Sequence, residues 1–123
     1  MRPLSENSNP RLRISNEIVH LHSEYYGRGP SKAKTYIQDD IVVVVLEETF
    51  TPAERTLIER GEGDGIHDIR RRFHQVMEDQ FKAIVEEATG RPVRAFMSET
   101  ALDQDVAIEV FLLGDGDGSD GAS

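Results

Sequence analysis

A run of six apolar residues, Ile-Val-Val-Val-Val-Leu from Ile41 to Leu46, constrains this chain more than any other stretch. Because β-branched side chains favour extended backbone and six residues are too few for a buried helix, we expect residues 41–50 to form a central strand. Alternate residues of a strand point to opposite sides, and here both sets are apolar. The sequence therefore predicts a sheet whose two faces are both covered.

Two amphipathic helices are predicted, one before and one after this strand. From Ile14 to Tyr25 apolar residues recur at steps of three and four, after a start at residue 10 or 11 and before Gly27, which ends the helix. The same periodicity runs further between Ile66 and Thr89, where a helix would span about 36 Å. This length is enough to cross a sheet, so we expect the long helix to cover one face.

A third, short helix is predicted between them. Thr51 is typical of a helix cap, and Glu54 stands three residues later, where the partner of a capping box is found. The helix is expected to end at Arg60, with Leu57 and Ile58 facing inward.

Three further strands complete the predicted sheet. Side chains alternate from Lys32 to Gln38, from Val93 to Glu99 and from Val106 to Leu113. Asp39-Asp40 predicts a tight connection that makes the first two strands a hairpin. The order α-ββ-αα-ββ is that of the α+β fold class, most simply a four-stranded antiparallel sheet covered by helices.

The second face of this sheet is predicted to need a cover of its own. We expect five side chains to share it: Tyr36, Val42, Val44, Phe96 and Phe111. The first helix, another subunit, or both would have to bury them. The sequence therefore predicts a homo-oligomer, a dimer or larger.

The chain is predicted to form one domain with two unstructured ends. Its 123 residues leave no room for a second domain, so we expect a flexible N-terminus (residues 1–10), a single α+β domain (11–113) and a disordered Gly- and Asp-rich tail (114–123). The net charge of −9 argues against nucleic acid as a partner. Because no run is long and apolar enough for direct membrane insertion, no signal peptide is found and cysteine is absent, we expect a cytoplasmic protein.

One basic segment, residues 27–34, contrasts with the acidic remainder. Its candidate ligand-binding residues are Gly27, Arg28, Gly29, Lys32 and Lys34. Two glycines expose backbone N–H groups beside three cations, an arrangement that binds small anions such as bicarbonate or phosphate. A helix-to-strand turn with solvated lysines explains the same residues and is the simpler interpretation.

No catalytic residues, metal ligands or cofactors are predicted. His20 and His22 point to different sides of their helix. His67 and His74 share a helix face, but two turns separate them by about 10.5 Å, too far to bind one metal ion together. His74 and Glu78 are expected to belong to a charged, solvated surface rather than to a metal site.

Two other charged groups have structural interpretations. The arginines at positions 70–72 spread around the long helix, so we expect solvation, or an ion pair between one of them and a strand carboxylate. Acidic residues gather at the predicted hairpin tips, Asp39 and Asp40 in the first and Glu99, Asp103 and Asp105 around the second. They would bind a cation only if both hairpins ended at the same edge.

Several motifs together resemble the bacterial MpsC family. They are Asn16-Glu17-Ile18-Val19, Tyr25-Tyr26-Gly27-Arg28-Gly29-Pro30 followed by Lys32-Ala33-Lys34, Leu46-Glu47, Thr51-Pro52-Ala53-Glu54, Thr89-Gly90-Arg91 and the run from Val106 to Phe111. The resemblance extends over about residues 13–113. It implies a component of a sodium-translocating, membrane-potential-generating system with a link to inorganic-carbon transport, for which no catalytic residues are established.

Three functions are consistent with these observations. The first, which we favour, is a soluble accessory or regulatory module without enzymatic activity that binds a membrane transport complex and is peripheral to the membrane through that partner. The second is a sensor of bicarbonate or phosphate that uses the basic segment. The third is a small enzyme with an active site at a subunit interface, for which the sequence holds no catalytic signature.

Overall fold

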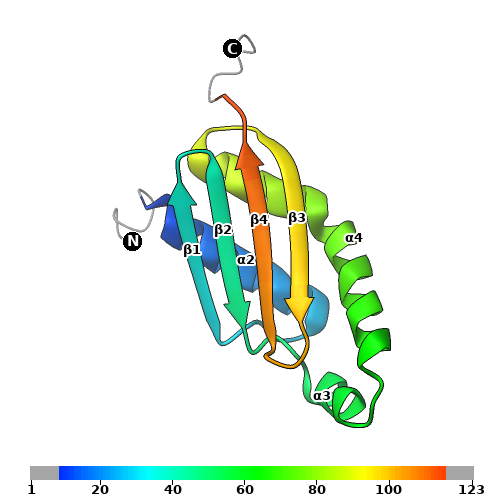
Figure 1. Cartoon of the computed structure of the whole chain (residues 1–123). Coiled ribbons are helices and arrows are strands. Elements are labelled where there is room, and N and C mark those ends of the chain that lie inside the picture. The colour runs from blue at the N-terminus through cyan, green and yellow to red at the C-terminus, as the bar shows by residue number, and fades with distance from the viewer. Residues whose placement is uncertain (1–8, 116–123) are drawn as a thin grey trace.

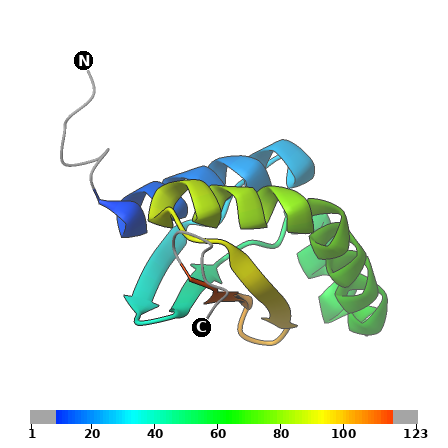
Figure 2. The ribbon, with the colours of Figure 1, turned by 90° about the horizontal axis from the view of Figure 1, so that it is seen from above.

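The computed structural model describes residues 9–115 and places two helices on one face of a four-stranded sheet (Figures 1 and 2). The elements are α2 (Pro10–Tyr26), β1 (Lys32–Gln38), β2 (Ile41–Glu47), α3 (Pro52–Glu59), α4 (Gly63–Thr89), β3 (Val93–Ala101) and β4 (Val106–Leu113). The predicted order and the α+β class are confirmed. Most of the two predicted unstructured ends lies outside the described residues.

Helices α2 and α3 begin where local chemistry predicts, whereas α4 begins at Gly63, three residues before the predicted Ile66, without a side-chain cap. The side chain of Asn9 accepts a hydrogen bond from the backbone N–H of Leu12, and Gly27 closes α2 with a positive φ of 81°. At the start of α3, Thr51 and Glu54 form the predicted capping box in both directions.

The sheet has the strand order β1-β2-β4-β3, and every neighbouring pair is antiparallel. Asp39 adopts a φ of 52°, which allows the two-residue turn that pairs Gln38 with Ile41. β2 ends at Glu47, three residues before the predicted end, because Glu48 turns the chain with a φ of 60°. At the opposite edge of the sheet, the register between β3 and β4 shifts between Val93 and Ala95.

The core lies between the sheet and the two long helices. Its fully buried side chains come from α2 (Ile14, Ile18), β2 (Val42, Val44, Leu46), α4 (Met77, Phe81, Val85) and β4 (Phe111). Figure 2 shows α2 and α4 side by side on the same side of the sheet. Of the covers predicted for the second face, the first helix is therefore excluded, and within residues 9–115 nothing covers that face.

The five side chains predicted to share the second face do not share one, and only Tyr36 lies on the face that the helices leave uncovered. Val42, Val44, Phe96 and Phe111 do share a face, but it is the face that packs against the helices. Tyr36 lies on the opposite, exposed face, because the two-residue turn pairs it with Val43. Alternation within a strand is visible in the sequence, whereas the register between strands depends on the turn.

α3 contributes little to the core. None of its residues is buried, and Leu57, which we expected to face inward, is exposed. No helix within residues 9–115 has the combination of length and hydropathy needed to span a bilayer.

Candidate functional site

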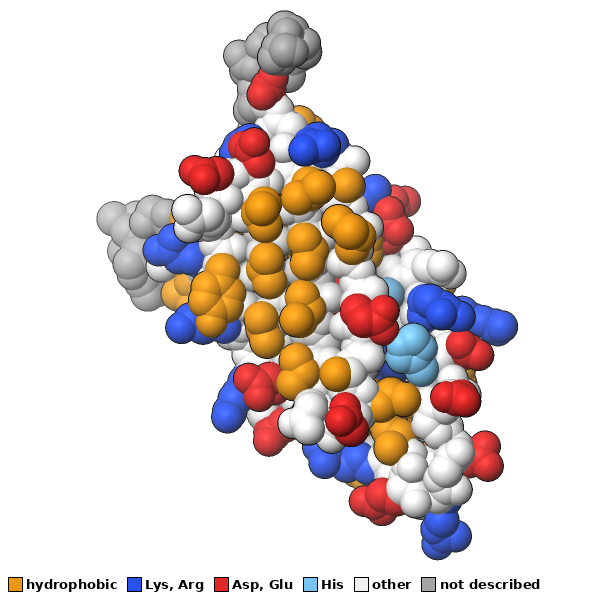
Figure 3. Space-filling view, in the orientation of Figure 1, with side chains coloured by type: hydrophobic (Ala, Val, Ile, Leu, Met, Phe, Trp, Pro, Cys, Tyr) orange, Lys and Arg blue, Asp and Glu red, His pale blue; other side chains and the backbone are white. Residues whose placement is uncertain are grey.

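The uncovered face of the sheet is the largest apolar surface in view. Figure 3 shows hydrophobic side chains gathered over all four strands. We refer to this surface as the open face, and its residues are Lys34, Tyr36, Ile41, Val43, Val45, Ala95, Met97, Glu99, Ile108, Val110 and Leu112. Tyr36, Ile41, Met97 and Ile108 are each 40–52% exposed. Contiguous apolar surfaces of this kind mark interaction sites on folded proteins.

Opposite charges stand at the two edges of the open face. Strand register places four residues in one row across the sheet, in the order Lys34, Val45, Ile108 and Glu99. The next row, Tyr36, Val43, Val110 and Met97, is entirely apolar. The open face is thus an apolar strip with a cation at the β1 edge and, at the β3 edge, the Glu99 carboxylate, which also lies 2.7 Å from His67 Nε2 of α4.

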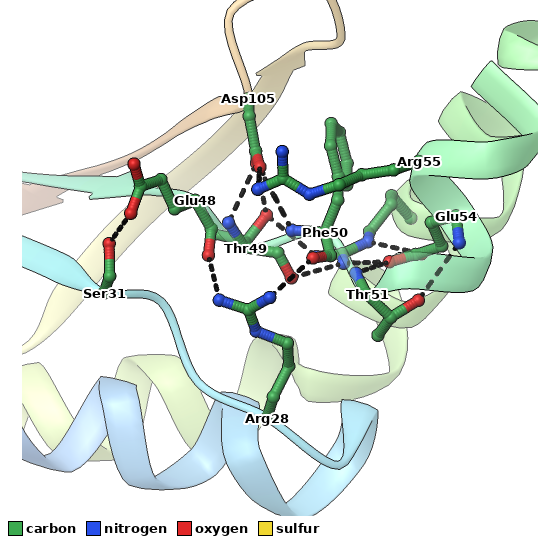
Figure 4. A network of polar contacts seen from close by, with 10 residues as sticks. Arg28, Ser31, Glu48, Thr49, Phe50, Thr51, Glu54, Arg55 and Asp105 are labelled. Atoms are coloured by element: carbon green, nitrogen blue, oxygen red, sulfur yellow. Dashed lines mark hydrogen bonds and ion pairs between the residues drawn. The ribbon is translucent and has the colours of Figure 1, made fainter. Parts of the chain in front are cut away.

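Asp105 organises a polar network at one end of the sheet (Figure 4). Its carboxylate accepts hydrogen bonds from the backbone N–H groups of Thr49 (2.8 Å) and Phe50 (3.3 Å) and pairs with Arg55 at 3.1 Å. These contacts hold the β3–β4 turn against the segment between β2 and α3. The two acidic hairpin tips lie at opposite ends of the sheet, so they do not form a joint cation site (Figure 1).

The predicted basic segment is divided between two structural settings. Arg28 donates hydrogen bonds to the backbone carbonyls of Phe50 (3.0 Å) and Glu48 (3.1 Å), as Figure 4 shows. Gly29 packs closely on α2, and the N–H of Gly27 caps that helix by donating to the carbonyl of Ser23.

The two lysines lie on β1 rather than in the turn. Lys32 begins the strand, and the Lys34 ammonium lies 5.3 Å from the centre of the Tyr36 ring. The segment also follows the C-terminal end of α2, where the helix dipole disfavours an anion. Anion binding by this segment stays a prediction.

One arginine of the 70–72 run is buried. Arg70 is 1% exposed, and its guanidinium pairs with Glu54 of α3 and donates to the carbonyl of Thr49 at 2.9 Å. It also lies over the Tyr26 ring, 3.9 Å from the ring centre. The sequence predicted an ion pair with a strand carboxylate as one option, but the partner is at the start of a helix.

Three ionisable residues meet inside the core: His22 from α2, His74 from α4 and Glu109 from β4. They are 1%, 5% and 0% exposed, and one nitrogen or oxygen of each lies within 4.8 Å of those of the other two. His74 Nε2 and Glu109 Oε2 are 3.8 Å apart, too far for a hydrogen bond. We refer to these residues as the buried triad.

Burial sets the charge state of the buried triad. Burial, together with a smaller effect of the nearby Arg70 charge, lowers the pKa of His22 to about 3 and that of His74 to about 4. Burial raises the pKa of Glu109 to about 7. The two imidazoles are therefore neutral at pH 7 and carry free lone pairs.

The sequence held partial signals for the triad. His22 lies four residues after Ile18, which puts it on the apolar stripe of α2, and Glu109 stands between Ala107 and Phe111 on the inward side of β4. His74 was expected on a solvated face with Glu78, but it is buried, and Glu78 pairs with Lys82 instead. Only the tertiary fold shows that the three residues meet.

Two helices packed on one face of an antiparallel sheet, with the other face open, define a two-layer α+β domain. A family model described as "Na+-translocating membrane potential-generating system (MpsC)" matches residues 9–115, so the chain belongs to the MpsC family, as its motifs indicated. The chain is 29% identical over 103 residues to the uncharacterized protein YbcI of Bacillus subtilis (strain 168). The alignment covers 81% of this chain and 82% of YbcI. No solved structure matches the chain.

Proposed function

We propose that this chain is an accessory module of an MpsC system that acts by protein–protein interaction, and that its open face binds the open face of a second copy. The observation that carries the proposal is the apolar strip over all four strands, which nothing within residues 9–115 covers. Removing such a strip from water contributes about 25 cal/mol for each Å² of apolar surface, from which the entropy cost of association is subtracted. Sheet-on-sheet packing is a common way to bury it.

Charge complementarity favours a second copy as the occupant. A two-fold axis parallel to the strands places β1 of one copy over β3 of the other. Lys34 and Glu99 belong to the same row, so this rotation brings the cation of each copy over the carboxylate of its partner. The same operation brings Tyr36 of each copy over Met97 of its partner. Apolar contacts between the two edge strands would therefore lie beside the two opposite-charge pairs.

The oligomeric state of the full chain tests this proposal. Sedimentation equilibrium between 1 and 200 μM is expected to show a dimer whose dissociation constant rises at least tenfold in Val43→Lys. Val76→Lys is the matched control, because Val76 is an exposed valine on α4, away from the open face. A monomer throughout this range for the unsubstituted chain would overturn the proposal.

A charge exchange tests the orientation of the two copies. Lys34→Glu alone and Glu99→Lys alone are each expected to weaken the dimer, because like charges then face one another. The double variant is expected to restore most of the affinity at low salt, since the pairing is re-formed with the signs reversed. Additive losses in the double variant would exclude the proposed two-fold arrangement.

The dimer is proposed to act in the cytoplasm, attached to the membrane through another subunit of the system. The description of the matching family names a membrane-potential-generating system, which supports this setting. Cross-linking in intact cells followed by identification of the partner is expected to recover a membrane-embedded subunit of the same system. Recovery of the homodimer alone would leave no support for the membrane attachment.

A further inference from the structure

The buried triad concentrates the unpaired polar atoms of the core. Six buried side-chain nitrogen or oxygen atoms within residues 9–115 have no hydrogen-bond partner: both ring nitrogens of His22, Nε2 of His74, both carboxylate oxygens of Glu109, and the hydroxyl of Tyr26. The Tyr26 ring lies 5.3 Å from the His22 ring, centre to centre, so all six atoms belong to one neighbourhood. Buried polar groups are normally satisfied, and a cluster of exceptions calls for an occupant.

His74 is held in the orientation of a ligand. Its Nδ1 lies 2.5 Å from the Ser98 hydroxyl, which fixes the imidazole ring. With the proton on Nδ1 and donated to Ser98, the lone pair of Nε2 points toward Glu109 and His22. Metal-binding histidines are typically oriented in this way, by a hydrogen bond from the nitrogen that does not bind the ion.

We propose that His22, His74 and Glu109 bind one divalent first-row transition-metal ion, such as Zn²⁺, between α2, α4 and β4. Two imidazoles and one carboxylate are a donor set that such ions prefer. Ligand atoms bound at about 2.1 Å lie roughly 3.4 Å apart around a tetrahedral ion. The donor atoms in the structure lie within 4.8 Å of one another, so binding draws them together by about an ångström.

The charges around the triad are compatible with a cation. Arg70 is the nearest positive group, and it acts on both histidines. Its guanidinium is paired with Glu54 at 2.5 Å, which offsets its charge. The Glu109 carboxylate then supplies the negative charge that the ion requires.

A surface cleft reaches one member of the triad, His74. It has a volume of about 210 Å³, and His74 and Ser98 form part of its lining. His67 and Glu99, which are joined at 2.7 Å, also line it. An ion entering here would reach His74 first, and once bound it would link the two long helices to the sheet.

Metal titration of the full chain tests the proposal. Protein freed of metal with a chelator is expected to bind about one equivalent of Zn²⁺ in competition with a chromogenic chelator, and its Tm is expected to rise. Co²⁺ is expected to give visible absorption of a nitrogen- and oxygen-bound ion. Stoichiometry below about 0.1 per chain, or weak binding that leaves Tm unchanged, would overturn the proposal.

Matched variants assign the ligands. His22→Gln and Glu109→Gln are each expected to weaken Zn²⁺ binding at least 100-fold, whereas His20→Gln, an exposed histidine of the same helix, is expected to bind as the unsubstituted chain does. Equal binding by His22→Gln and the unsubstituted chain would overturn the assignment.

The unsubstituted chain provides a measurement that does not depend on variant folding. Its imidazole nitrogen resonances are expected to shift on Zn²⁺ addition for His22 and His74 and to stay in place for His20. Shifts confined to the exposed histidine would mean surface binding and would refute the site. Failure to dimerise would not alter this readout, because the three proposed ligands lie on the helix side of the sheet and only Glu99 is common to the cleft and the open face.

Discussion

Arg70 donates two hydrogen bonds to Glu54, from Nε at 2.9 Å and from Nη2 at 2.5 Å, and so joins α4 to the first turn of α3. The arginine side chain is 2% exposed and the glutamate side chain 14%. Glu54 also completes the capping box with Thr51. One carboxylate therefore both starts α3 and neutralises a buried cation.

Removal of this carboxylate is expected to be costly. Glu54→Ala leaves Arg70 buried without its partner, and we expect the free energy of unfolding to fall by about 3–5 kcal/mol. Urea denaturation followed by circular dichroism measures the change. Glu59→Ala, an exposed glutamate of the same helix, is the control and should change the free energy by less than about 0.5 kcal/mol. A small loss in Glu54→Ala would mean that water solvates Arg70.

The same pair predicts a pH dependence. Burial acts to raise the pKa of Glu54, but hydrogen bonds from Arg70 and Thr51 outweigh it and hold the pKa below its ordinary value of 4.5. The stabilisation is therefore present above pH 4.5 and is lost as the pH falls through the lowered pKa of the folded state. The difference in unfolding free energy between the unsubstituted chain and Glu54→Gln should shrink between pH 6 and pH 3. A difference that is constant over this range would contradict the ion pair.

Asp105 is expected to stabilise the fold rather than to bind a cation. Asp105→Ala removes the acceptor for two backbone N–H groups and also places alanine at a φ of 52°, so we expect a loss of about 2–4 kcal/mol. Asp103→Ala, at an exposed position in the same turn, should have almost no effect. Urea denaturation of the two variants in the same buffer measures their unfolding free energies. Equal values would refute the stabilising role of Asp105.

Two glycines are expected to respond in opposite directions to alanine. A Cβ at Gly29 would lie 3.1 Å from both a side-chain and a backbone atom of Val19, so Gly29→Ala should cost about 1–3 kcal/mol by forcing the turn away from α2. A Cβ at Gly65, inside α4, meets nothing within 4 Å, so Gly65→Ala should add about 0.5–1 kcal/mol to stability. Thermal unfolding of both variants provides the comparison. A neutral Gly29→Ala would show that Val19 can move enough to accommodate the Cβ and would refute the close packing as the reason for this glycine.

Local signals in the sequence predicted the helices and strands. The contacts between residues far apart in the chain were not predicted. The valine run, the Thr51 cap and Gly27 each act within a few residues, so their structures follow from neighbours in the chain. The face of Tyr36 depends on strand register, and the meeting of His22 with Glu109 depends on how α2 crosses the sheet. Such relationships are set by packing between distant segments, which periodicity in a single sequence does not encode.

The two outer strands determine how the sheet can associate. β1, at one edge of the sheet, carries Lys32 and Lys34. At the other edge, the register shift between Val93 and Ala95 distorts β3. Lysines and bulges of this kind hinder the addition of a further strand. A sheet with one apolar face and two protected edge strands can associate face to face into a closed dimer. Edge-to-edge growth into an amyloid-like fibril is disfavoured.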